Sequence, residues 1–217
     1  MLVEILQVIQ LLTAAATFLL LLYGIDSWRR EHLGRRRMDM AEEALALFYE
    51  AKDHIESIRF SGSLGYEYEG VTQAEGESDD SFAARKQASI VYTRYESRKE
   101  TFVKLYAMRY RFMAAFGPES GKPFDEMSRI SNEIKSAAWS LARMWSQKTF
   151  VNEQAYRQHE AIRLRHEAVF WDSQDEDDPI NPQVKQVIAD IEGICRPIIE
   201  SQSTLYGLLN WRAFGRK

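Results

Sequence analysis

The sequence predicts an all-α fold, in which an N-terminal transmembrane helix is followed by an up-and-down bundle of four long helices. Residues 5–23 contain no ionised side chain. After them, apolar residues recur at intervals of three and four, which is the period of a helix buried on one side. No stretch alternates β-branched and polar residues as a strand would.

The N-terminal helix is predicted from residues 5–23, which read ILQVIQLLTAAATFLLLLY. A run of about 19 residues is long enough to cross a hydrocarbon layer of ~30 Å. A cleaved signal peptide would need positive charge before the run and small residues at its end. Instead, Glu4 precedes the run and the three alanines lie inside it. We therefore expect an uncleaved anchor over residues 1–25, with a buried core helix as the alternative.

The residues after the run predict the orientation of the anchor and its contacts with the membrane surface. Arginines that follow an anchor favour the cytoplasmic side, and tryptophan favours the headgroup layer. In the C-terminal tail, aromatic residues alternate with basic ones, a mixture that suits the same layer. In outline the chain resembles bacterial single-pass proteins with a short N-terminal anchor, so we expect it in the inner membrane with residues 26–217 in the cytoplasm. The expected membrane-interface residues are Trp28, Arg29, Arg30, Arg35, Arg36, Arg37, Trp211, Arg212 and Phe214.

The anchor is also predicted to self-associate. Gln7, Gln10, Ala14 and Thr17 follow steps of three and four, so they share one face of the helix. A glutamine amide in hydrocarbon lacks water, and small residues allow two helices to approach closely. This stripe therefore favours a homo-oligomer.

The bundle is expected to begin with a helix over residues 26–60, followed by an acidic loop over residues 61–79. The loop contains four glycines and four glutamates, too polar a composition for a packed core, so we expect it to be mobile. The second helix is expected over residues 80–116, because Gly117 and Pro118 follow it. Its aromatic residues are expected in the core, with its arginines on the outer face.

For the second half of the chain, the sequence leaves two helix arrangements open. A single rod over residues 124–171 is the preferred arrangement, and it gives four helices in all. The stretch Thr149–Asn152 consists of weak helix formers, so the alternative is a break there and a bundle of five. The last helix begins after Pro182, with a kink expected at Pro197.

The sequence shows no arrangement of residues that would support catalysis or a cofactor. None of the four histidines has a glutamate three residues before it, as a di-iron bundle would need. Residues 117–123 are one residue short of a phosphate-binding loop and lack its final serine or threonine. Cys195 lies among isoleucines of the last helix, which indicates a packed thiol. We therefore expect a non-enzymatic protein with no cofactor and no metal site.

The charge balance excludes a general affinity for nucleic acid. The chain has 32 acidic residues against 28 lysines and arginines, for a net charge of −4. A nucleic-acid-binding domain would show a basic field instead. The plainest function is a membrane-anchored bundle that binds or organises protein partners at the cytoplasmic face. The alternatives are an oligomeric membrane effector that forms a pore, and a ligand-binding sensor.

Overall fold

The structure is a computed structural model that describes residues 2–173 and 177–202. It does not describe the side chains of residues 2–12, 15, 22, 26, 27, 30, 201 and 202. Every regular element in the described residues is helical and none is a strand, which confirms the predicted all-α class. The α-helices are α1 (Leu2–Arg59), α2 (Asp79–Glu96), α3 (Lys99–Phe116), α4 (Lys122–Met144), α5 (Glu153–Phe170) and α6 (Asn181–Gln202), with short 3-10 helices η1 (Gly65–Tyr68) and η2 (Pro118–Gly121).

The chain divides into two compact units. One comprises residues 1–42 with 196–217, and the other comprises residues 43–195. Helices α1 and α6 each contribute residues to both units. The second unit contains α2 to α5 and is the helical bundle.

The described part of the chain contains no helix with a stretch that is both long enough and apolar enough to cross a membrane. The anchor expected over residues 1–25 therefore has no support from the described residues. Residues 2–25 belong to the same continuous helix as the first expected bundle helix, since α1 runs from Leu2 to Arg59.

The core of the bundle follows the periodic stripes of the sequence. In the bundle part of α1, Leu45, Phe48, Ile55 and Ile58 are buried, and the intervening polar residues lie outside. The strongest one-sided helix is α4, where the stripe at intervals of three and four is fully buried. Its core residues are Phe124, Met127, Ile130, Ile134, Ala137, Ala138 and Leu141.

The second expected helix is in fact two helices, α2 and α3, with a break at Ser97 and Arg98. No glycine or proline causes the break. The backbone N–H of Arg98 donates to the carbonyl of Tyr95 at 3.0 Å, three residues back. The carbonyl of Arg94, the usual acceptor in a continuing helix, instead accepts from the Ser97 hydroxyl at 2.8 Å and from the Arg98 guanidinium. Local side-chain hydrogen bonds therefore replace the helical ladder here.

The preferred single rod over residues 124–171 is also wrong, and the alternative break is correct. Helix α4 ends at Met144, and α5 begins at Glu153. The Asn152 side chain caps α5 by accepting from the N–H of Ala155 at 2.8 Å. The weak helix formers at 149–152 thus form a connection between two helices.

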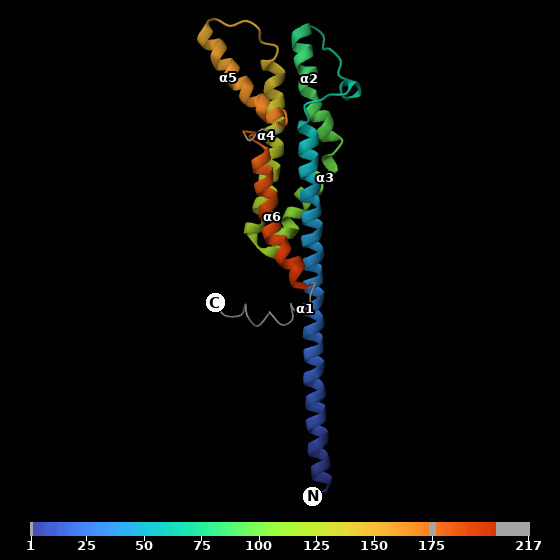
Figure 1. Ribbon diagram of the computed structural model, residues 1–217. Coiled ribbons are helices and arrows are strands. Elements are labelled where there is room, and N and C mark those ends of the chain that lie inside the picture. The colour runs from blue at the N-terminus through green and yellow to red at the C-terminus, as the bar shows by residue number, and fades with distance from the viewer. Residues whose placement is uncertain (1, 174–176, 203–217) are drawn as a thin grey trace. The chain divides into compact units, whose positions relative to one another are not determined.

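The chain reverses direction between α4 and α5, but α5 and α6 run the same way (Figure 1). Phe170, at the end of α5, packs its ring on Trp145 just beyond α4, whereas Gln183 near the start of α6 accepts a hydrogen bond from Arg129 in the first half of α4. Helix α6 also contacts α1, because the Tyr49 hydroxyl bonds Glu192. The fourth run of the bundle is therefore α5 and α6 in succession.

Candidate functional site

The expected membrane-interface residues on α1 are solvent-exposed where the structure describes them. Trp28 stacks on His32 with ring centroids 5.7 Å apart, and Arg35 pairs with Glu31 at 3.4 Å. Exposed side chains are also found at Arg29, Arg36 and Arg37. The side chain of Arg30 and the tail residues Trp211, Arg212 and Phe214 lie outside the described residues.

The self-association stripe is described only in its second half. Ala14 and Thr17 are exposed, and the Thr17 hydroxyl donates to the carbonyl of Thr13 at 2.8 Å. The side chains of Gln7 and Gln10 are not among those described. The stripe stays a prediction.

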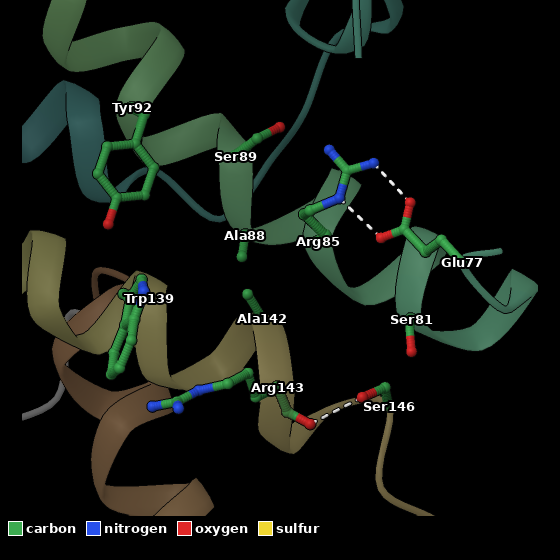
Figure 2. A pocket seen from close by; sticks show the side chains of 10 residues that line it. All are labelled: Glu77, Ser81, Arg85, Ala88, Ser89, Tyr92, Trp139, Ala142, Arg143 and Ser146. Atoms are coloured by element: carbon green, nitrogen blue, oxygen red, sulfur yellow. Dashed lines mark hydrogen bonds and ion pairs between the residues drawn. The ribbon is translucent and has the colours of Figure 1, made fainter. Parts of the chain in front are cut away.

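The bundle contains a groove that the sequence did not single out. It lies between α2 and α4, is open to solvent and has a volume of about 430 Å³ (Figure 2). Ala88 of α2 and Ala142 of α4 face one another across it, as Figure 2 shows. Small side chains at this crossing leave the hollow, because larger residues would fill the space between the helices. A volume of this size is within the range of small-molecule sites.

The charged side chains of the groove are two arginines and one glutamate. Arg85 binds Glu77 through two hydrogen bonds of 2.7 Å, from Nε to Oε1 and from Nη2 to Oε2. This guanidinium and the N–H of Ala74 lower the pKa of Glu77 to about 2, so the glutamate is ionised at neutral pH. Among the described residues Arg143 has no carboxylate within 4 Å, and its guanidinium carbon lies 3.6 Å from the ring centroid of Trp139. The groove lining therefore carries one uncompensated positive charge.

Two aromatic rings line the groove beside Arg143. Trp139 is 57% exposed and Tyr92 is 39% exposed. The Tyr92 hydroxyl donates to the carbonyl of Lys135 at 2.8 Å, which fixes that ring. Trp139 lies off the buried stripe of α4, so a helical projection of the sequence would place it at the surface. The juxtaposition with α2 could not be read from the sequence.

A fully buried arginine, Arg59, connects the end of α1 to the end of α5 and the start of α6. Its guanidinium bonds Asp178 through both terminal nitrogens, at 3.1 and 2.7 Å. It also donates to the carbonyls of Ala168, Val169 and Trp171. Burial opposes ionisation of Asp178, but Arg59 and three backbone N–H groups outweigh it and hold the pKa of Asp178 below its ordinary value. This cluster is structural, since it satisfies the last carbonyls of α5.

A second buried arginine, Arg94, corrects the expectation that the arginines of this region lie on the outer face. It pairs with Glu67 of η1 at 2.6 Å and donates to the carbonyls of Ile58, Phe60 and Gly62. The hydrogen bond from Arg94 lowers the pKa of Glu67 despite partial desolvation. Glu67 is itself buried, so this part of the acidic loop is packed against the bundle. The mobility expected for residues 61–79 stays a prediction.

Helix α3 has an exposed stripe of apolar residues at Val103, Tyr106 and Tyr110. These side chains are 57–63% exposed and share one face of the helix. The rings of Tyr106 and Tyr110 pack edge to face, with centroids 5.9 Å apart. The core position expected for all aromatics of this region therefore holds for Phe102 and Phe112 and not for these tyrosines.

The histidine and cysteine residues considered above as candidates for catalysis or metal binding do not form a shared site among the described residues. In the described part of the chain, no group of three or more His, Cys, Asp or Glu side chains is placed to hold a metal ion. Cys195 is buried, and burial raises the pKa of its thiol to about 12, so little thiolate forms at neutral pH. His159 packs on Phe150 at 4.8 Å between ring centroids.

Comparison of the chain with protein-family models, curated proteins and solved structures finds no match.

Proposed function

We propose that the chain is a membrane-anchored, non-enzymatic helical bundle that binds protein partners at the cytoplasmic face of the membrane. The anchor would be residues 1–25, inserted with residues 26–217 in the cytoplasm. Self-association through the stripe of Gln7, Gln10, Ala14 and Thr17 is part of the proposal.

The observation that carries the proposal is the exposure of the apolar residues in the N-terminal part of α1. Phe18, Leu19, Leu20 and Leu21 are each at least 60% exposed. Consecutive residues of a helix are about 100° apart, so four in succession cover its whole circumference. An apolar helix exposed all round needs a non-aqueous environment or another protein. The basic residues that follow it favour the bilayer.

Protein binding is supported by the exposed stripe of α3. Large aromatic side chains are typical of the centres of protein interfaces. Two ion pairs, Lys104–Glu100 and Lys99–Glu96, lie near the stripe, so these four charges are already compensated. A partner would therefore bind through apolar contact.

Membrane attachment is tested by fractionation of the full chain. We expect it to remain with membranes after a carbonate wash, and a C-terminal reporter fusion to read as cytoplasmic. Release of the protein by carbonate would refute the proposed anchor, and a periplasmic reporter signal would refute the proposed orientation.

Partner binding is tested by purification in mild detergent followed by mass measurement. Tyr106→Ser with Tyr110→Ser should lose a partner that the parent retains, whereas the control Tyr156→Ser, an exposed tyrosine of α5, should keep it. Retention of the partner by the double variant would exclude the α3 stripe as the interface.

The self-association element is tested by replacing Gln7 and Gln10 together with Leu. The double variant should insert normally but shift to smaller detergent-solubilised species. An unchanged oligomer mass would assign any assembly to the bundle. The pore-forming alternative is distinguished by ion conductance across vesicles, which an anchored scaffold does not produce.

A further inference from the structure

We propose that the groove between α2 and α4 binds a small molecule with a flat apolar ring and one acidic group. Arg143 would pair with the acid, and the rings of Trp139 and Tyr92 would contact the apolar part. This site is independent of the membrane anchor and of the α3 stripe.

The charge of the groove selects an anion. Three charged side chains line it, and two of them, Arg85 and Glu77, neutralise one another through a bidentate pair. Figure 2 shows this pair joined by two contacts, whereas no contact joins the Arg143 guanidinium to another residue drawn there. One guanidinium thus remains for a ligand, and guanidinium binds carboxylate, sulfonate or phosphate oxygens in a planar fork.

The apolar surface of the groove selects a flat ring. The methyl groups of Ala88 and Ala142 point toward one another, and Tyr92 and Trp139 lie on the same side of them (Figure 2). The indole of Trp139 holds the Arg143 guanidinium against its face, which restricts the guanidinium to a position beside the rings. A ring and an acid joined by a short link would reach both groups together.

Four hydroxyl groups line the groove, and most of them are already used as donors within the chain: Tyr92 donates to the carbonyl of Lys135, whereas Ser81 accepts from Ser78. Ser89 donates to the carbonyl of Lys86 at 2.7 Å, and Ser146 donates to the carbonyl of Arg143 at 2.8 Å. The Ser89 proton is therefore used within α2, and the Ser146 proton is used in the turn that follows α4. A neutral polar ligand would find few free donors here, whereas an anion would find Arg143.

The volume favours a small molecule over a docked helix. A helix with its side chains is about 10 Å across, and the approximately 430 Å³ of the groove would hold only a short segment of it. A two-ring aromatic acid fits within that volume.

The experiment titrates the full chain, in a non-ionic detergent, with three probes that share a naphthalene ring and differ in charge. These are 2-naphthoate, 2-naphthylmethanol and 2-naphthylmethylammonium, each measured by calorimetry against a detergent blank. We expect naphthoate to bind at least tenfold more tightly than either of the others. Equal affinities for the three probes, or no binding of any, would overturn the proposal.

The variants assign the binding to the groove. Arg143→Gln should weaken naphthoate binding at least tenfold and leave the affinity for the neutral probe unchanged, because it removes the charge-assisted hydrogen bonds of the guanidinium. Trp139→Leu should weaken both probes. The matched control is Arg129→Gln, an exposed arginine of the same helix outside the groove. A loss equal to that of Arg143→Gln in this control would mean general electrostatic attraction and would refute the site.

Both groove variants are expected to fold, because Arg143 and Trp139 are partly or largely exposed. Circular dichroism melting of each variant checks this before titration. A folded Arg143→Gln variant that binds naphthoate as tightly as the parent would also refute the proposal. Membrane attachment is measured separately, so failure of the groove leaves the proposed function intact and failure of the anchor leaves the groove intact.

Discussion

Replacing Arg59 with Met is expected to destabilise the bundle strongly, because it breaks a buried ion pair. The side chain is fully buried, and the side chain of its partner Asp178 is 1% exposed. Met keeps the length of the side chain but leaves Asp178 as a buried charge without its counter-charge. The carbonyls of Ala168, Val169 and Trp171 also lose a donor.

Removing one partner of a buried ion pair costs about 3–5 kcal/mol. With a urea m value of about 2 kcal/mol per molar, the unfolding midpoint should fall by about 1.5–2.5 M. Far-ultraviolet circular dichroism in urea measures this midpoint. The matched control is Arg157→Met, since Arg157 and Glu153 form a pair in which both side chains are 75% exposed, and it should change stability by less than about 1 kcal/mol.

A double-mutant cycle separates the buried charge from lost packing. Arg59→Met combined with Asp178→Asn no longer contains the buried, unpaired Asp178 carboxylate, although the partly exposed Asp172 still loses Arg59. The double variant should therefore be more stable than the sum of the two single losses by about 0.5–3 kcal/mol. An additive double variant would show that Asp178 is not coupled to Arg59. A single variant within about 1 kcal/mol of the parent would refute the assignment of the cluster as a principal support of the bundle.

Three further outcomes are expected. The pKa of Asp178 in the folded protein is held below its ordinary value of 3.8, so its contribution to stability is complete above that pH and is lost as the pH falls through the folded pKa. The urea midpoint of the parent should therefore decline below about pH 4, and Asp178→Asn should make that decline less steep. Cys195, whose pKa is raised to about 12 by burial, should resist iodoacetamide at pH 8 until the chain is denatured, and rapid native labelling detected by mass spectrometry would contradict its buried position. Arg94→Gln should release η1, so that a glutamate-specific protease cuts the chain within residues 67–77 faster than in the parent. The control is the substitution of an exposed residue, Lys99→Gln. Equal cutting rates in the two variants would show that Arg94 does not hold this loop against the bundle.

The sequence predicts the helical class and most of the core, because burial on one side of a helix requires the spacing that the residues show. The stripe of α4 is an example, since Met127, Ile130, Ile134, Ala138 and Leu141 are all buried as expected. The break near 149–152 could also be anticipated, because it depends on local propensity. Periodicity and helix propensity depend only on residues that are close in the sequence, so both features can be predicted without knowledge of the tertiary structure.

The features that the sequence could not give depend on residues far apart in the chain. Arg59 and Arg94 look like surface residues by type, and only partners up to 119 positions away make their burial possible. The break at Ser97 and Arg98 lies in a stretch with ordinary helix formers and depends on side-chain hydrogen bonds to one carbonyl. The groove needs α2 and α4 to cross at Ala88 and Ala142, which no local pattern specifies.

The contacts of Arg59 can form only late in the synthesis of the chain. Asp178 follows this arginine by 119 residues in the chain. At about 5–20 residues per second, the ribosome needs about 6–24 s to supply that partner. During this interval the apolar stripe of α1 has emerged without the helices α5 and α6 that complete its surroundings. Arg59 can therefore reach its buried, fully bonded state only after α5 and the start of α6 have been made.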